Sequence, residues 1–151
     1  MLMWPMMVDV FAGVAVATDG CTIGVYLITD ADDGALLATD VVHCKSAHAE
    51  LESMRAAVRA LEYLRTVTQA TIYTDSSSLA ALLSGYVQPP RGMGRLVLDI
   101  RRRMGVLKCN VSVHLSCSDA LATVRQLATA ATRSGYVPPT PLQYGLLVNR
   151  I

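Results

Sequence analysis

The sequence has little charge and few aromatic side chains. Charged residues make up 17% and aromatic residues 5% of its 151 positions, and the formal net charge is only +1. A chain with this balance has no overall basic field that would attract it to nucleic acid or to an acidic membrane, so any such affinity must be local. Because 52% of the residues are apolar, we expect a single globular domain with a surface short of charge, which favours an oligomer or a larger assembly.

The sequence also lacks a long uninterrupted hydrophobic run, and it has no Cys-x-x-Cys pair. Its apolar beginning, residues 1–16, has no basic residue before it and is interrupted by Pro5 and Asp9, so neither a signal peptide nor a membrane span is predicted. We therefore expect an intracellular protein, cytoplasmic or nuclear, with no membrane partner. The four cysteines are expected to be reduced, because a domain of this size does not need disulfides.

Hydrophobic periodicity predicts one mixed α/β domain of five strands and four helices. The strands are expected at residues 11–18, 22–29, 35–43, 70–74 and 109–115. The helices are expected at residues 46–65, 76–83, 95–104 and 118–133. The first three strands are predicted to form an antiparallel meander, and the two later strands, which follow helices, to run parallel to a neighbour. The single domain, residues 1–151, would then have its core at about 11–133 and an extended, proline-containing tail at 134–151.

Four acidic residues fall at the ends of these predicted elements. Asp19 and Asp75 each follow a strand, whereas Glu50 and Asp119 each begin a helix. Each has an ordinary structural explanation, because Asp-Gly suits a hairpin turn and an acid suits a helix N-terminus, as a cap or against the dipole. Taken together, however, the four could gather at one end of the sheet, where carboxylates repel one another unless cations bind them. This favours a site for two magnesium ions.

Three segments resemble, in order and spacing, the type 1 ribonuclease H family: TDG at 18–20, AEL at 49–51 and YTDS at 73–76. The hairpin at 18–27 is similar to the short version in reverse transcriptases of retroelements and pararetroviruses. The resemblance covers about residues 11–133 and implies a ribonuclease H-like fold. It also implies hydrolysis of the RNA strand of RNA·DNA hybrids by water activated at two Mg²⁺ or Mn²⁺ ions. Asp19, Glu50 and Asp75 would be catalytic metal ligands.

The fourth catalytic metal ligand has two candidate positions under this resemblance. The segment SDAL at 118–121 matches the family's acid in its Ala-Asp-x-Leu context, and this register, with Asp119 as the ligand, is preferred. Alignment on the helix body instead puts Arg125 at the acid's position, and such a domain would bind metal poorly. The alternative function is then a catalytically degenerate ribonuclease H-like domain that acts as a structural, nucleic-acid-binding or protein-interaction module.

The first strand also has two candidate registers. The distance from Asp19 to Gly24 favours the register in which Asp19 is the acid. In the other register residues 8–13 form the first strand, with Ala12 at the acid's place. The family's loop with a mobile catalytic histidine is cut short after His114, which is expected to be a strand residue.

Basic residues gather between residues 91 and 108, where arginines occupy positions 95, 101, 102 and 103 of a predicted helix. We interpret Arg95, Arg101, Arg102 and Arg103 as substrate-binding residues that contact phosphates, which would make affinity depend on salt and little on sequence. A solvated helix end is the alternative. In the family a basic helix near this position helps to bind the hybrid, whose RNA strand is recognised by its 2′-hydroxyls and A-like shape. A larger replication or reverse-transcription assembly is the expected context.

Overall fold

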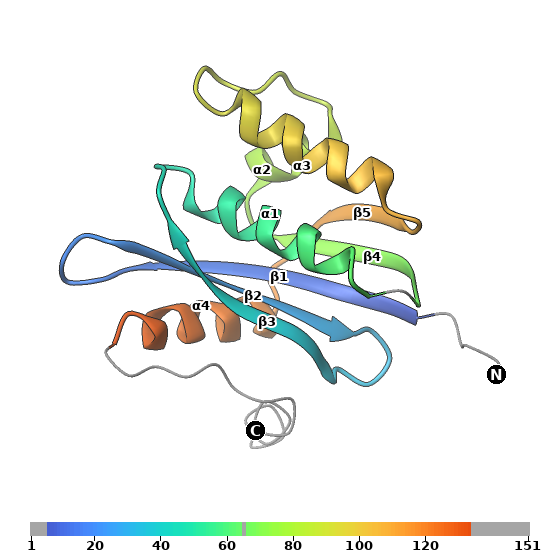
Figure 1. The fold of residues 1–151 in the computed structure, drawn as a ribbon, viewed down its shortest axis with the longest axis horizontal. Coiled ribbons are helices and arrows are strands. Elements are labelled where there is room, and N and C mark those ends of the chain that lie inside the picture. The colour runs from blue at the N-terminus through green and yellow to red at the C-terminus, as the bar shows by residue number, and fades with distance from the viewer. Residues whose placement is uncertain (1–5, 65, 134–151) are drawn as a thin grey trace.

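The computed structural model describes residues 6–64 and 66–133. They form a five-stranded sheet with helices on both faces (Figure 1), in the strand order β3-β2-β1-β4-β5. The strands are β1 (Met6–Val16), β2 (Thr22–Asp30), β3 (Leu36–Cys44), β4 (Val67–Thr74) and β5 (Asn110–Leu115). The helices are α1 (Ala49–Leu61), α2 (Ser77–Ser84), α3 (Gly94–Val106) and α4 (Asp119–Ala131).

The predicted mixed sheet is confirmed. The pairs β1–β2 and β2–β3 are antiparallel and form the meander, whereas the pairs β1–β4 and β4–β5 are parallel. The predicted tail at 134–151 lies outside the described residues. Within them, no helix combines the length and the apolar character needed to cross a membrane.

The first strand begins five residues earlier than predicted and ends two residues earlier, since it spans Met6–Val16 rather than 11–18. Asp9 interrupts the apolar run in the sequence, but it does not interrupt the alternation of the strand. Val8 and Val10 lie in the core beneath α1, whereas Phe11 lies in a second core beneath α4. Because neighbouring residues of a strand point to opposite faces, Asp9 falls on the α4 face. Among the described residues, the first residues of β1 therefore already belong to the core, with Met6 packed against it.

Two glycines allow a helix to approach the sheet closely. On the α4 face, a Cβ atom added at Gly13 would lie 3.0 Å from the backbone nitrogen of Arg125 and 3.0 Å from the carbonyl carbon of Val124. On the α1 face, a Cβ atom at Gly24 would collide with the hydroxyl of Ser53. On each face, the helix therefore packs directly against a glycine of the sheet. Figure 1 shows α4 on one side of the sheet and α1 and α3 on the other.

Gly13→Ala is expected to lower the free energy of unfolding by about 1–3 kcal/mol, because the added carbon pushes the backbone of α4 away from β1. The matched control is Gly105→Ala in the last turn of α3, where an added Cβ meets nothing within 4 Å. This control should raise the free energy of unfolding by up to about 1 kcal/mol, because alanine is the better helix former. Urea denaturation measures both free energies of unfolding. A change of the same sign in both variants would contradict the close packing at Gly13.

Candidate functional site

Asp75 follows β4 directly, and its side chain does not cap the next helix. The cap of α2 is Ser76, whose hydroxyl accepts a hydrogen bond from the backbone N–H of Leu79 at 3.3 Å. The backbone N–H of Ser76 in turn donates to the hydroxyl of Thr74 at 3.1 Å. The carboxylate of Asp75 is therefore available for another partner, so the cap interpretation of this residue does not hold.

That partner is Arg125 of α4. Its Nη2 donates to Oδ1 of Asp75 over 2.7 Å, the length of a strong charge-assisted hydrogen bond. The side chains remain partly open to water, with 45% of Arg125 and 30% of Asp75 exposed. The hydrogen bond to Asp75 raises the pKa of Arg125 further, so the guanidinium is charged at every relevant pH. Asp75 and Arg125 form a direct ion pair between β4 and α4.

Glu50 adds a second carboxyl group to this ion pair. It lies in the first turn of α1, and its Oε1 is buried with no hydrogen-bond partner among the described residues. Burial raises the pKa of Glu50, the charge of Arg125 lowers it, and the charge of Asp75 raises it again, with a net increase. Two acids and one guanidinium thus interact electrostatically at the end of β4. We call Glu50, Asp75 and Arg125 the charged triad.

Asp19 lies away from the charged triad, in the turn that joins β1 to β2. Its side chain accepts a hydrogen bond from the backbone N–H of Cys21 at 3.0 Å, and this bond lowers the pKa of Asp19. The turn is exposed, and Figure 1 shows the β1–β2 hairpin extending well beyond the end of β4. Asp19 has the structural role of a hairpin-turn residue.

Gly13, rather than Asp19 or Ala12, is the residue of β1 nearest in register to Asp75. The parallel pairing of β1 with β4 sets Phe11 opposite Tyr73. Continuing this register by two residues brings Gly13 level with Asp75. The second of the two predicted registers therefore describes the strand better, displaced by one residue from the expected position at Ala12.

Asp119 begins α4, where Ser118 caps the helix by accepting from the N–H of Leu121 at 3.3 Å. The side chain of Asp119 is exposed. Arg125 lies six positions after Asp119, which places the two about 9 Å apart along the helix and about 120° apart around it. Asp119 therefore points away from the face on which Arg125 meets Asp75.

The structure brings together Glu50 and Asp75 but not all four predicted acids. Among residues 6–64 and 66–133, no three side chains of His, Cys, Asp or Glu are grouped so that they could hold a metal ion. Two acids with one guanidinium carry a net charge of −1 when ionised, and the arginine already occupies an oxygen of Asp75 at 2.7 Å. This donor set does not fit a pair of divalent cations, which would need more carboxylates and no arginine.

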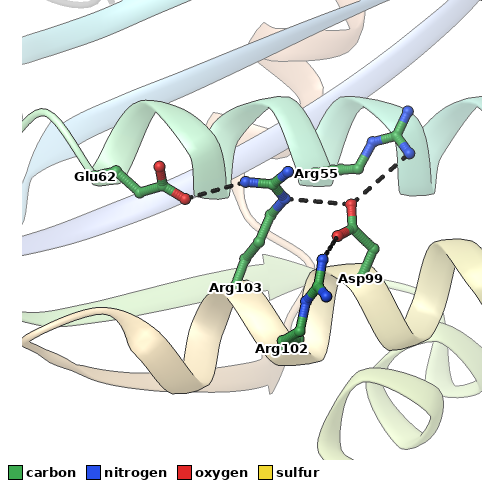
Figure 2. Close-up of polar contacts among 5 residues, drawn as sticks. All are labelled: Arg55, Glu62, Asp99, Arg102 and Arg103. Atoms are coloured by element: carbon green, nitrogen blue, oxygen red, sulfur yellow. Dashed lines mark hydrogen bonds and ion pairs between the residues drawn. The ribbon is translucent and has the colours of Figure 1, made fainter.

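The predicted substrate-binding arginines divide into two groups. Arg102 and Arg103 bind Asp99 on their own helix α3, at 3.1 and 3.2 Å, and Arg103 also binds Glu62 near the end of α1 at 3.2 Å. Arg55 of α1 approaches Asp99 at 3.9 Å. Figure 2 shows these five side chains as one network between α1 and α3. Arg103, with 25% of its side chain exposed, serves mainly to join the two helices.

Arg95 and Arg101 have no ion-pair partner in the part of the chain that the structure describes. Both are exposed, and Arg102 keeps 76% of its side chain exposed despite its ion pair. The guanidinium of Arg101 lies against Gly85, where an added Cβ would come within 2.8 Å of its Nη2. These three arginines leave positive charge on the outer surface of α3.

Two residues that matter here are not singled out by the sequence patterns. Gly13 lies next to the charged triad. The alternation of buried residues Val8, Val10 and Ala12 continues the strand through Asp9 and could have predicted that Gly13 belongs to it. Asp99 anchors the arginine network, and its signal is the spacing of three and four residues to Arg102 and Arg103. His114 is an exposed strand residue, with its ring 6.1 Å from that of Tyr73.

Glu50→Gln is expected to raise the thermal midpoint at pH 7 and to change it little at pH 4. A carboxyl whose pKa is raised by folding stabilises the fold while protonated, and this stability is lost as the pH rises above the unfolded value of about 4.5. The neutral amide avoids that loss. Calorimetry at the two pH values measures the difference.

The matched control for this prediction is Glu52→Gln in the same helical turn. Burial raises the pKa of Glu52, but hydrogen bonds from Ser46 and Lys45 lower it by more, so the net direction is opposite to that of Glu50. Its contribution is present above the unfolded value and is lost as the pH falls through the folded pKa. Glu52→Gln should therefore lower the midpoint at pH 7. A gain in both variants would contradict the assignment for Glu50.

The sequence matches no family model and no curated protein. The structure is similar to the N-terminal RNase H domain of rv2228c from Mycobacterium tuberculosis, with a TM-score of 0.71 and 16% identity over 84% of this chain and 94% of that one. It is also similar to LC11-RNase H1 in complex with an RNA/DNA hybrid, with a TM-score of 0.67 and 13% identity over 79% of this chain and 91% of that one.

A third similar structure belongs to a much longer protein, the foamy viral protease-reverse transcriptase in complex with an RNA/DNA hybrid. Here the TM-score is 0.58 and the identity 10%, and the match covers 87% of this chain but 21% of that one. The three matches have TM-scores of 0.58 to 0.71 at identities of 16% or lower, so the likeness is one of structure rather than of sequence. The chain therefore has the ribonuclease H fold.

Proposed function

We propose that the chain is a ribonuclease H-like domain that does not cleave nucleic acid and acts as a structural or nucleic-acid-binding module of a larger assembly. One observation carries this proposal, the ion pair of 2.7 Å between Arg125 and Asp75. A cluster of acids needs cations for its stability, and here a guanidinium of the chain itself supplies that charge.

The packing around Gly13 supports the same proposal. An acid at this position of β1 would stand level with Asp75, but even one additional carbon would come within 3.0 Å of the backbone of α4. The glycine and the arginine therefore belong to one arrangement, in which α4 packs close to β1 and its side chain at 125 reaches Asp75. Placing a carboxylate at position 13 would require α4 to move.

Hydrolysis of the RNA strand of RNA·DNA hybrids stays a prediction from the sequence. It assigns Asp19, Glu50, Asp75 and Asp119 as ligands of two Mg²⁺ or Mn²⁺ ions, which would activate the attacking water and stabilise the leaving oxygen. The separation of Asp19 and Asp119 from the other two acids argues against it. A single assay tests this prediction against the proposed function.

Two observations favour a larger assembly with nucleic acid. Structures with the same fold were determined with an RNA/DNA hybrid, and one of them is part of a viral protease-reverse transcriptase. On this chain the outer surface of α3 carries three exposed arginines, Arg95, Arg101 and Arg102. Such a surface can bind the phosphates of a duplex, and phosphate contacts carry little specificity for the base sequence.

Incubation with an RNA·DNA hybrid and Mg²⁺ or Mn²⁺ is expected to give no chelator-sensitive cleavage above that of Asp75→Asn. The variant keeps the size of the side chain but removes the charge that a metal ion would need. Electrophoresis of the end-labelled RNA strand measures the product. Cleavage by the wild type that disappears in Asp75→Asn would overturn the proposed function and support the two-metal prediction.

Thermal unfolding with and without millimolar Mg²⁺ provides a readout that does not depend on turnover. A site with four acids should gain stability from the cation by mass action, whereas the charged triad should not respond. The comparison variant is Arg125→Gln, which leaves the two acids without their guanidinium. A clear rise in the wild-type midpoint would contradict the proposed role of Arg125.

Replacing Arg95 and Arg101 together with alanine is expected to weaken binding of an RNA·DNA hybrid and to reduce its salt dependence. The slope of log K against log salt should fall by about 1 for each phosphate that the variant no longer neutralises. The matched control is Arg59→Ala with Arg133→Ala, which removes the same charge from exposed positions outside α3. Fluorescence anisotropy at several salt concentrations measures both, and equal reductions in affinity would assign the effect to net charge alone.

A further inference from the structure

A cavity of about 590 Å³ lies at the opposite end of the sheet from the charged triad. Its walls come from the end of α1, the beginning of β4, the end of α3 and the turn into β5. The lining residues are Leu61, Glu62, Leu64, Val67, Val106, Leu107, Lys108 and Cys109. In Figure 1 these segments meet near the start of β1, at the opposite end of α1 from its first turn. Glu50 lies in that first turn.

The cavity is mainly apolar. Leu61 and Val67 form its buried part, with 3% and 7% exposed, while Val106 at its edge keeps 69% of its surface exposed. Of its two charged residues, Glu62 is bound to Arg103 outside the cavity at 3.2 Å. A large apolar side chain bound here would remove the surface of Val106 from water, which is favourable because Val106 is apolar.

The first described residue of the chain stands at the edge of this cavity. Met6 pairs with Val67, which lines the cavity, and its N–H donates to the carbonyl of Thr66 at 3.2 Å. Its own carbonyl accepts from the hydroxyl of Thr68 at 3.3 Å. The main chain at Met6 is therefore fixed beside the cavity, and residues 1–5 are covalently joined to it at that point.

The chemistry of this segment matches the cavity. Its sequence, MLMWP, has no charged side chain and contains the only tryptophan of the chain. Pro5 has no N–H with which to extend the β1 ladder. Trp4 is two residues before Met6, a separation that an extended chain spans in about 7 Å, so Trp4 can reach the cavity. The tail at 134–151 follows α4, which ends at the other end of the sheet in Figure 1.

We propose that this cavity is the docking site of the N-terminal segment Met1–Pro5, with the indole ring of Trp4 inserted between the end of α1 and the α3–β5 turn. The segment then covers Val106 and the thiol of Cys109. This inference is independent of the proposed function, because none of its residues belongs to the charged triad or to the exposed arginines of α3.

The single tryptophan makes the proposal directly measurable. The fluorescence emission of the folded protein is expected to be blue-shifted from that of the urea-unfolded chain, and acrylamide should quench it several-fold less. Val106→Glu should shift the emission towards the unfolded value. The matched control is Leu98→Glu on the same helix, which is 57% exposed and lies outside the cavity; it should leave the emission unchanged.

Thiol labelling supplies a second readout with a variant that leaves the folded core intact. Trp4→Ala should increase the rate at which iodoacetamide alkylates Cys109, as read by peptide mass spectrometry. The rate at Cys21, which is exposed in the β1–β2 turn, should not change. An unchanged rate at Cys109 would overturn the proposal.

The other occupants give different results. Emission of the folded wild type at the unfolded wavelength means that Trp4 is not docked and overturns the proposal. A blue shift that vanishes on dilution assigns the cavity to the segment of a second copy, which also overturns docking within one chain. If removal of residues 134–151, and not Trp4→Ala, exposes Cys109, the C-terminal tail is the occupant instead.

Discussion

The close approach of α4 to β1 at Gly13 is the contact on which the arrangement of the candidate site depends. Because position 13 has no side chain, the backbone of α4 can lie against the strand, and Arg125 is carried to the end of β4. A bulkier residue at 13 would hold the helix farther out and lengthen the 2.7 Å contact with Asp75. Packing on one face of the sheet thus determines the electrostatics at its end.

The charged triad explains how two acids coexist in this position. Glu50 is partly buried and its pKa is raised, yet the positive charge of Arg125 limits that increase. The guanidinium bonds to Asp75 and interacts with Glu50 through space, so it offsets both carboxyl groups with one side chain. An internal cation of this kind is covalently attached and cannot be removed by a chelator. Under the function proposed above, the pair of acids is a structural element of the domain.

Periodicity and turn residues were sufficient to predict the sheet, because each strand and helix has its own local pattern. The limits of β1 were not predictable in this way, since Asp9 interrupts the apolar run and its place on the α4 face depends on the folded sheet. The candidate site was predicted only in part. Glu50 and Asp75 adjoin elements whose ends are determined by local sequence, whereas the partners of Asp75 depend on how α4 docks. The sequence alone left Asp119 and Arg125 as alternatives for that reason.

The strand order has a consequence for how the chain folds. The meander from Met6 to Cys44 contains only neighbouring antiparallel pairs, so it can form early and through short loops. The pair between Met6 and Val67 joins residues that are 61 positions apart (67 − 6), so a long loop must close before it forms. The second edge of β1 is therefore covered only after α1 and β4 have been added. Until then the apolar strand β1 presents an open edge, which is a hazard for aggregation. The slowest step of folding is therefore expected to be the addition of β4, the strand that ends at Asp75.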